Sequence, residues 1–478
     1  MSDALLTLTA DAGLTAALAR ALATELRAGD TVLLDGPVGA GKSHFARALI
    51  RARLDDPCHE VPSPTFTLVQ TYEGDPAIWH ADLYRLTDPA EVDELGLTDA
   101  LPDSIALIEW PDRMGQVADA LTIRIQPVAD DPDLRRISIH GDGPRGQMAR
   151  RAAQRADFVH RAGWGAARVA RLAGDASARR YFRLTQEGGA TSVLMDSDAT
   201  TLAPYLAMTG WLRARDFAAP AVLAADPGAG LALIEDLGDA QIAGIVAADP
   251  DRAGPLYLRI AGLLARLAAC PPAPGIAALD GARMADQVGL FAQYYPPAAG
   301  AEADARAAAD EIAPVIAGLY RVLCADIAPV TSLRDFHAEN IILTPDDRLG
   351  LIDFQDAVAA HPGYDLVSVL DDPRRALPDG VAEGARAHFL ALTGLEPDRF
   401  AAASALLSAQ RNLRIMGIYT RLCTDFGKPR YLGFMPRTWA LIESAVAHPA
   451  LAPLAGLVAR IPAPTPGIIE RIAATCRR

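Results

Sequence analysis

The stretch DFHAENIILTPDDRLGLIDF, residues 335–354, places two carboxylates and one carboxamide at fixed intervals. Asp335 and Asn340 lie five residues apart, and Asp353 follows thirteen residues later. The apolar runs IIL and LGLI between them predict a short strand hairpin, which would hold the three side chains in one place. A carboxylate can accept a proton from a hydroxyl group, and an Asn–Asp pair can hold a divalent cation beside a phosphate. The stretch therefore predicts an α+β domain built around phosphate chemistry.

The same spacing is that of a kinase catalytic loop, D-x-x-x-x-N, followed by a metal-binding Asp. Asp335 would then be the catalytic base, and Asn340 and Asp353 would bind the metal ion. The loop begins DFHAEN instead of the H-R-D-L of protein kinases, and no A-P-E-type ending follows it. His337 is expected to pack or to hydrogen-bond within the loop, and Asp365 to be structural. The segment is thus closer to small-molecule phosphotransferases than to protein kinases.

A second phosphate-binding pattern, GPVGAGKS, occupies residues 36–43. It satisfies G-x-x-x-x-G-K-[ST], with the apolar run TVLLDG before it and a stretch of helical spacing after it. The backbone N–H groups of such a loop and the N-terminus of its helix hold phosphate oxygens, while the serine hydroxyl ligates Mg²⁺. We therefore expect an α/β P-loop NTPase domain that uses ATP and Mg²⁺. Its nucleotide-binding residues would be Gly36, Gly39, Gly41, Lys42 and Ser43, the last of them as a metal ligand.

The length of 478 residues allows two or three domains, each with its own core. We expect the P-loop domain over residues 1–142, a linker over 143–158 and a kinase-like phosphotransferase domain over 159–478. The last would have a small lobe (about 159–238) and a helical lobe (about 239–478). The runs LTIRIQP and RRISIHG are expected as antiparallel edge strands that close the first domain. The predicted fold class is an α/β P-loop NTPase domain followed by an α+β bilobal protein-kinase-like phosphotransferase domain.

Composition restricts the environment and the partners. The net charge of −14 and the pI near 5.1 argue against a large nucleic-acid-binding surface, so any contact with RNA would run through a protein partner. The five cysteines are scattered without a CxxC pair, which predicts reduced thiols in a cytoplasmic protein. The first residues lack the pattern of a signal peptide, and no apolar run approaches the roughly 20 residues that span a bilayer. We expect no membrane segment.

Four stretches after the P-loop carry a more specific signal: VPSPTFTLV (61–69), HADLYRL (80–86), ELGL (94–97) and IALIEWPDR (105–113). Glu109 ends the apolar run IALIE, where a Walker-B-type carboxylate would hold Mg²⁺. In this order the stretches resemble the TsaE family of small ATPases, which supports threonylcarbamoylation of adenosine 37 in tRNA. The resemblance covers about residues 5–140 and implies protein partners like TsaB and TsaD. It also implies that Glu109 and Asp82 serve in catalysis; surface ion pairs and turn capping are their alternative roles.

The second domain carries five matching stretches: LAGDASARRYFRL (172–184), VLMDS (193–197), SLRDFHAENIIL (332–343), LIDFQDA (351–357) and AQRNLRIMGIYTRL (409–422). Across about residues 165–440 they resemble the aminoglycoside/choline phosphotransferase family. The similarity is closest to the branch that phosphorylates the anomeric position of N-acetylmuramate and N-acetylglucosamine. It implies a phosphate-covering hairpin at GDASARRYF and an adenine-binding hinge near Glu235.

Lysine is nearly absent: of 45 basic residues, only Lys42 and Lys428 are lysines. TsaE-like proteins carry a further basic residue, often lysine, near the end of the domain, where this chain offers only arginines such as Arg135. In the second domain, the strand that supplies an ATP-binding lysine in kinases reads VLMD. Either Arg179 or Arg180 substitutes for that lysine, or metal ions alone position the triphosphate, or the domain binds without catalysing.

Contacts with the acceptor are the least defined part of the second domain. A polar break in a helical stretch offers Gln410, Arg411 and Asn412, and Lys428 is a further candidate; helix capping and inter-helix hydrogen bonds are open alternatives. The two resemblances together imply a bifunctional fusion, in which an ATPase supports tRNA modification and a kinase phosphorylates an amino sugar in cell-wall recycling. The alternatives are a kinase for another alcohol, such as an aminoglycoside, choline or homoserine, and a non-catalytic regulatory module.

Overall fold

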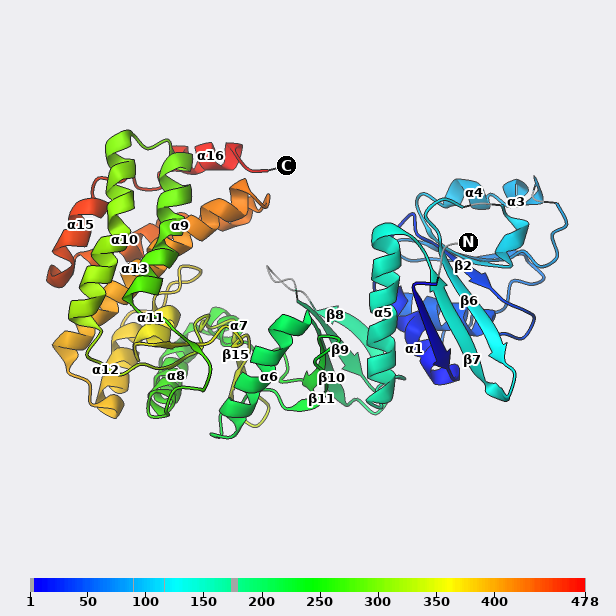
Figure 1. Ribbon diagram of the computed structural model, residues 1–478, viewed down its shortest axis with the longest axis horizontal. Coiled ribbons are helices and arrows are strands. Elements are labelled where there is room, and N and C mark those ends of the chain that lie inside the picture. Colours follow the sequence, from blue (N-terminus) through cyan, green and yellow to red (C-terminus); the bar gives the residue numbers. More distant parts are fainter. Residues whose placement is uncertain (1–3, 89, 116, 173–178, 478) are drawn as a thin grey trace. The chain divides into compact units, whose positions relative to one another are not determined.

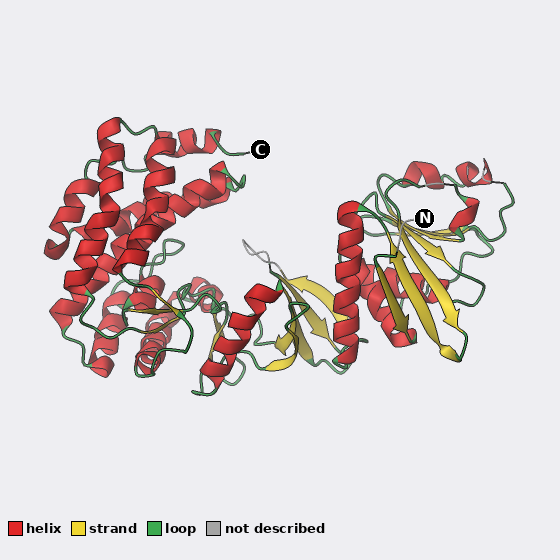
Figure 2. Ribbon diagram, viewed as in Figure 1, coloured by secondary structure: helices red, strands yellow, loops and turns green. Residues whose placement is uncertain are grey.

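The computed structural model describes residues 4–88, 90–115, 117–172 and 179–477 (Figure 1, Figure 2). The chain divides into two compact units. The first comprises residues 1–203 and 221–236, and the second comprises residues 204–220 and 237–478. Each unit has apolar cores of its own. The P-loop therefore belongs to the first unit and the DFHAEN segment to the second.

The N-terminal part of the first unit is a seven-stranded sheet with its helices. Its elements are β1 (Leu6–Ala10), α1 (Ala12–Ala23), β2 (Thr31–Asp35), α2 (Lys42–Arg53), β3 (Val69–Tyr72), β4 (Ile78–Asp82), α3 (Ala90–Glu94), α4 (Leu97–Ala100), β5 (Ile105–Glu109), η1 (Pro111–Arg113), β6 (Leu121–Val128) and β7 (Asp131–His140). The strand order is β1-β7-β6-β2-β5-β4-β3. β2 pairs in parallel with β5 and β6, and β4 with β5, which confirms the predicted α/β fold of this part.

The edge of this sheet differs from the prediction. β6 and β7 do pair antiparallel, but β6 lies next to β2 inside the sheet, and β1 pairs with β7 at the edge. The prediction that β6 and β7 are edge strands was therefore wrong. An edge strand such as β1 is only half buried, so its short alternating pattern gave a weak signal, whereas all five residues of β5 are buried.

Parallel pairing brings the candidate residues to one edge of the sheet. The P-loop follows β2, Asp82 ends β4 and Glu109 ends β5. Carboxyl ends of adjacent parallel strands meet at the same edge, which is where open α/β sheets bind their ligands.

Residues 143–158, the expected linker, lie within helix α5 (Gly143–Arg161). Ala149, Ala152, Ala153 and Ala156 follow the i, i+3, i+4, i+7 spacing and pack into the same core as α1 and α2. Phe158 and Val159, one turn further, pack into the core of a second, five-stranded sheet of order β11-β12-β10-β9-β8. The elements of this part are β8 (Arg168–Leu172), β9 (Arg180–Thr185), β10 (Thr191–Asp196), β11 (Val222–Asp226) and β12 (Leu231–Glu235). Helix α5 thus contributes to two cores of the first unit, one under each sheet.

The second unit is mainly helical. Helix α6 (Ala199–Arg213) begins in the first unit and ends in the second. The remaining elements are α7 (Ile242–Ala248), η2 (Pro250–Arg252), α8 (Ala253–Ala268), β13 (Ala277–Ala278), α9 (Gly281–Ala299), α10 (Ala303–Leu323), β14 (Val330–Ser332), β15 (Ile341–Leu343), β16 (Leu349–Leu351), β17 (Val358–Ala360), α11 (Tyr364–Leu370), α12 (Val381–Thr393), α13 (Pro397–Thr424), η3 (Pro429–Phe434), α14 (Met435–Val446), η4 (Pro449–Leu451), α15 (Ala452–Val458) and α16 (Pro466–Ala474).

Helices α9, α10 and α13 lie side by side at the centre of this unit's core (Figure 1). Gly417 of α13 permits their close approach, because a Cβ there would lie 2.5 Å from the carbonyl oxygen of Leu290 on α9. In the described part of the chain, no single helix combines the length and apolar composition of a membrane span. The successive stretches Pro429–Val446 and Pro449–Val458 reach that length only together and are bent by 101° at their break.

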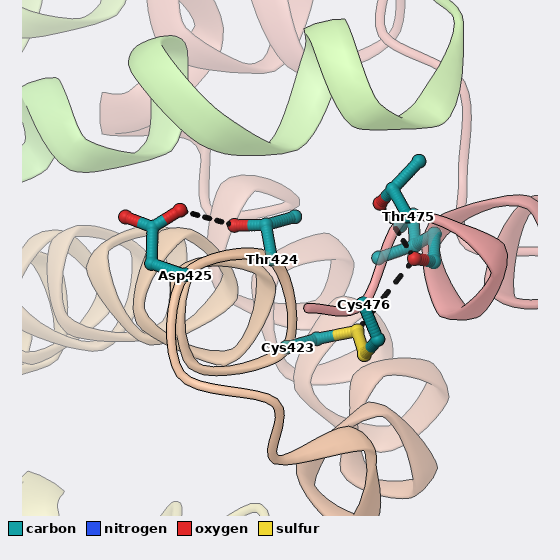
Figure 3. The surroundings of a disulfide bond; sticks show 6 residues. Cys423, Thr424, Asp425, Thr475 and Cys476 are labelled. Carbon is teal, nitrogen blue, oxygen red and sulfur yellow. Dashed lines mark hydrogen bonds between the residues drawn. A yellow bond between two sulfur atoms is a disulfide. The ribbon is translucent and has the colours of Figure 1, made fainter. Parts of the chain in front are cut away.

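A disulfide joins Cys423, near the end of α13, to Cys476, just after α16 (Figure 3). This pair corrects the prediction that all five cysteines are reduced thiols. The two cysteines are 53 residues apart in the sequence, and only the packing of α16 against α13 brings them together. Cys58, Cys270 and Cys324 are free.

Candidate active sites

The P-loop forms a tight turn between β2 and α2. Gly36, Gly39 and Gly41 all have positive φ angles, of 150°, 74° and 110°. At Gly36 a Cβ would lie 2.1 Å from the carbonyl oxygen of Ile125 on β6, so only glycine fits this backbone. Lys42 and Ser43 are the first residues of α2, and their backbone N–H groups stand at the positive end of the helix dipole. The loop therefore has the construction of a phosphate cradle.

The Lys42 ammonium group is buried within that loop. It donates hydrogen bonds to the carbonyl oxygens of Gly36 (2.8 Å) and Pro37 (3.0 Å), and it lies 3.9 Å from the ring centroid of Trp110. Burial lowers the pKa of Lys42, and the negative charges of Glu109, Asp82 and Asp35 oppose that effect. A bound phosphate would add a further opposite charge beside the ammonium group.

Glu109 lies between Ser43 and a buried histidine. Its Oε2 accepts a hydrogen bond from the Ser43 hydroxyl at 3.2 Å, and its Oε1 lies 3.0 Å from Nε2 of His80. Glu109 is only 2% exposed, which excludes the alternative of a surface ion pair. The serine and carboxylate oxygens are hard donors of the kind that Mg²⁺ prefers.

Asp82 lies directly opposite Glu109 in the parallel register of β4 and β5. Its Oδ2 accepts a hydrogen bond from the Thr65 hydroxyl at 2.7 Å, and its Oδ1 accepts one from the Tyr84 N–H at 3.0 Å. Through the second hydrogen bond Asp82 caps a turn, which is one of the alternative roles considered for it. Asp82 is 4% exposed and hence no surface residue either.

Two contacts at this site were not predicted. His80 is fully buried beside Glu109, and the signal was its position two residues before Asp82, because alternate residues of a strand share one face. Arg135 of β7 donates a hydrogen bond from Nε to the carbonyl oxygen of Ala40 in the P-loop at 3.0 Å. The arginine at the end of this domain therefore supports the loop backbone.

The stretch 335–354 places Asn340 in contact with both Asp335 and Asp353. β15 and β16 form the expected antiparallel hairpin, with Ile341 opposite Leu351. The Asn340 amide nitrogen donates to the carbonyl oxygen of Asp335 at 2.9 Å and lies 3.5 Å from Oδ2 of Asp353. Asp353 has a φ angle of 59°, which turns the chain just after β16.

Asp365 anchors the approach to this segment. It accepts hydrogen bonds from the Ser332 hydroxyl (2.6 Å) and from the backbone N–H groups of Leu333 (2.7 Å) and Arg334 (3.1 Å). Burial raises the pKa of Asp365 to about 6, against the effect of these three donors. Burial also lowers the pKa of His337 to about 3, so this ring is neutral and hydrogen-bonds with the Asn340 amide at 3.2 Å. Both residues thus have the structural contacts expected of them.

Two oxygen-bearing pairs are available for divalent cations, Ser43 with Glu109 and Asn340 with Asp353. No group of three His, Cys, Asp or Glu side chains suited to a metal occurs in the ranges that the structure describes. Mg²⁺ typically takes only one or two protein ligands and completes its shell with phosphate oxygens and water. Each pair therefore fits Mg²⁺ bound together with ATP.

The nucleotide-binding candidates of the phosphotransferase part lie in the first unit. Arg179 directly precedes β9, and residues 174–178 of the predicted phosphate-covering hairpin lie outside the described residues. The Arg180 guanidinium forms ion pairs with Glu25 (3.2 Å) and Asp196 (2.9 Å). Glu235 is exposed at the end of β12, where its Oε2 accepts a hydrogen bond from the Ala221 N–H at 2.9 Å.

Arg180 belongs to a buried ion network that joins the two parts of the first unit. Arg155 of α5 pairs with Glu25, which follows α1, and with Asp196 at the end of β10 at 2.8 Å. Arg151, one turn earlier on α5, donates from Nε to Asp196 at 2.7 Å. The side chains of Arg155 and Asp196 are each 3% exposed. Asp196, the last residue of VLMD, therefore carries a buried charge that pairs with Arg155 and Arg180.

We expect Arg155→Leu to lower the free energy of unfolding by about 3 kcal/mol. That is the low end for breaking a buried ion pair, because Arg180 still faces both carboxylates. Urea unfolding followed by circular dichroism measures the change. Arg161→Leu is the matched control on the same helix, since its side chain is 60% exposed and pairs only at the surface. Equal shifts in the two variants would show that the network does not stabilise the fold.

The predicted acceptor contacts differ in their surroundings. Gln410 is fully buried and donates from Nε2 to the carbonyl oxygen of Met284 on α9 at 3.0 Å. Asn412 is also fully buried and donates to the carbonyl oxygen of Ser408 at 3.0 Å. The Gln410 bond is the inter-helix hydrogen bond of the stated alternatives, whereas the Asn412 bond stays within α13. Lys428 is half-buried before η3, and its backbone N–H donates to the carbonyl oxygen of Leu422.

Known proteins match both parts of the chain. The family model of threonylcarbamoyl adenosine biosynthesis protein TsaE matches residues 9–137, and the model of the phosphotransferase enzyme family matches residues 168–402. The tRNA threonylcarbamoyladenosine biosynthesis protein TsaE of Rickettsia conorii is 40% identical over 123 residues, which cover 26% of this chain and 70% of that protein.

The second part of the chain is similar to two kinases over more than nine-tenths of their length. The N-acetylmuramate/N-acetylglucosamine kinase of Caulobacter vibrioides is 37% identical over 349 residues, which cover 64% of this chain and 94% of that protein. The kinase of the same name from Pseudomonas aeruginosa is 30% identical over 321 residues, covering 63% of this chain and 91% of that protein. The chain therefore belongs to the TsaE family through its N-terminal part and to the phosphotransferase enzyme family through the remainder, joining two ATP-using enzymes in one polypeptide.

Proposed function

We propose that the N-terminal part hydrolyses ATP in support of N6-threonylcarbamoyladenosine formation at position 37 of tRNA. Backbone N–H groups of residues 36–43 and the Lys42 ammonium group would bind the phosphates, and Ser43 with Glu109 would hold Mg²⁺. Bound Mg²⁺ would neutralise charge that develops on the phosphate oxygens. Asp82 would orient the attacking water. The acidic chain favours cytoplasmic protein partners like TsaB and TsaD over direct contact with RNA.

The second part would phosphorylate the anomeric hydroxyl of N-acetylmuramate or N-acetylglucosamine, as a step of cell-wall recycling. The hydroxyl oxygen attacks the γ-phosphorus, the bond between that phosphorus and the bridging oxygen of ADP breaks, and the hydroxyl proton passes to the Asp335 carboxylate. Asn340 and Asp353 would hold Mg²⁺, while Arg179, Arg180 and Glu235 would serve the nucleotide. The observation that carries this proposal is that the Asn340 amide nitrogen contacts both the backbone carbonyl oxygen of Asp335 and the carboxylate of Asp353.

Product analysis by ³¹P NMR tests the second activity. The full chain would be incubated with Mg·ATP and, in turn, N-acetylmuramate, N-acetylglucosamine, an aminoglycoside, choline and homoserine. We expect a sugar 1-phosphate signal with the amino sugars only. A phosphorylated product with another alcohol would reassign the substrate, and release of inorganic phosphate alone would leave the P-loop as the sole active site.

A further inference from the structure

Three arginines of the second unit lie beside the DFHAEN segment, and we refer to Arg374, Arg375 and Arg411 as the arginine cluster. Arg374 and Arg375 follow α11 and are partly exposed, with side chains 29% and 20% accessible. Arg411 lies in the middle of α13 and is only 5% exposed. A buried guanidinium is retained only where an anion or several acceptors face it, because its charge is costly to remove from water.

The cluster has more positive than negative charge. Glu339 pairs with Arg375 at 2.8 Å and with Arg374 at 3.7 Å, and the buried Asp372 lies 3.3 Å from Arg374 and 3.5 Å from Arg375. The Arg411 guanidinium has no hydrogen bond or ion pair with any residue that the structure describes, and its NH1 atom is fully buried. The two carboxylates are thus engaged by Arg374 and Arg375, and the third guanidinium, which is unmatched, is the most deeply buried.

The cluster is next to the predicted catalytic base. Glu339, which pairs with two of its members, stands between Asp335 and Asn340 in the same loop. The pKa of His337 is lowered by burial and then by the charges of Arg374, Arg411 and Arg375. Burial lowers the pKa of Arg374, but the negative charges around the side chain have the larger total effect and raise this pKa. These charges belong to Asp372, Tyr419, Glu339 and Asp335. Arg374 and Arg411 therefore both act on the loop that would bind the acceptor.

We propose that Arg411, assisted by Arg374, binds the carboxylate of an anionic sugar acceptor. This inference rests on the proposed kinase function and names the part of the acceptor that the cluster recognises. N-acetylmuramate carries a carboxylate on its lactyl group, whereas N-acetylglucosamine has none. A guanidinium binds a carboxylate through two parallel hydrogen bonds, and such a bond would supply the partner that Arg411 lacks. The cluster would thereby favour the acidic sugar over the neutral one.

Steady-state kinetics of Arg411→Gln with both sugars tests the proposal. We expect kcat/KM for N-acetylmuramate to fall at least about tenfold, chiefly through KM, while kcat/KM for N-acetylglucosamine and KM for ATP change less than about twofold. Arg374→Gln, at a more exposed position, should show the same selectivity with a smaller loss. Arg386→Gln on α12 is the control for removing an arginine outside the cluster. Circular dichroism before the assay verifies that each variant is folded.

The possible results separate the two proposals. Equal losses for both sugars, no loss for either sugar, or a raised KM for ATP would overturn the carboxylate subsite while leaving the kinase in place. If Arg411→Gln does not fold, Arg374→Gln alone decides. If the unmodified chain phosphorylates neither sugar, the kinase proposal fails. Calorimetric titration of the unmodified chain and Arg411→Gln with N-acetylmuramate then decides the subsite, which is rejected if both bind equally or not at all.

Discussion

Asp335→Asn is expected to reduce sugar phosphorylation by about a hundredfold to ten-thousandfold, the range that a general base contributes. Asparagine has the same shape but cannot accept the hydroxyl proton. The loop should survive the change, because Asp335 holds it through backbone atoms: its N–H donates to the carbonyl oxygen of Leu333, and its own carbonyl oxygen accepts from Asn340. Within the described residues its carboxylate has no hydrogen-bond or ion-pair partner. The rate of sugar 1-phosphate formation measures the effect.

Asp356→Asn is the matched control for Asp335→Asn. Asp356, three residues after Asp353, is an exposed carboxylate whose side chain accepts one hydrogen bond in the described structure, from Gln355 Nε2 at 2.9 Å. We expect it to retain phosphorylation within about twofold of the unmodified chain, because an exposed carboxylate that is not the base is usually replaced at little cost. Comparable losses in the two variants, or full activity in Asp335→Asn, would contradict the assignment of the base.

The parts of the molecule that the sequence predicted correctly are those with local spacing. The hairpin between Asn340 and Asp353 is a contiguous run, so its apolar strands and polar ends are visible together. The P-loop is likewise a single turn between one strand and one helix, and the family resemblances built on such stretches were confirmed. Glu109 was identifiable because a carboxylate at the end of a wholly buried strand is uncommon unless it has a partner.

The features that escaped prediction depend on contacts between distant residues. β1 pairs with β7 across most of the N-terminal part, and Cys423 meets Cys476 only through the packing of α16. Helix α5 begins with a basic, glycine-containing stretch that is typical of a linker. Its alanines nevertheless pack into the apolar core of the N-terminal part, which the sequence alone does not show. Arg180 stands where the sequence suggests a phosphate ligand, but it pairs with Glu25, which lies 155 positions away in the chain.

The unpaired charge of Arg411 is another feature that depends on contacts between distant residues. Its place in a polar break of α13 was visible, but Asp372, Glu339 and Arg374 come from other segments. Only the folded chain shows that two carboxylates are already engaged by Arg374 and Arg375. Net local charge is a property of side chains gathered in space, so sequence spacing could not supply it.

Lys42→Met is expected to reduce ATP hydrolysis by the N-terminal part by about a hundredfold or more, comparable to the loss of one charged donor at a developing negative charge. Methionine retains an unbranched stem that can lie against Trp110, so the change removes the charge and its bonds to Gly36 and Pro37 while preserving most of the packing. The assay should use an Asp335→Asn background without sugar, so that hydrolysis by the phosphotransferase part is suppressed. Lys428→Met, which removes the other lysine, is the control and should leave this hydrolysis unchanged.

The same Lys42→Met chain, with Asp335 intact, should phosphorylate sugar at the unmodified rate. Lys42 takes no part in the Glu25–Arg155–Asp196 network, so the shared architecture of the first unit is expected to persist without its charge. Asp335, Asn340 and Asp353 belong to the second unit, which has a core of its own. Retained phosphorylation with lost hydrolysis therefore means two independent sites. Loss of both activities in a folded variant would instead mean that the P-loop controls the phosphotransferase, and the helix α5 network would then be the first route of communication to test.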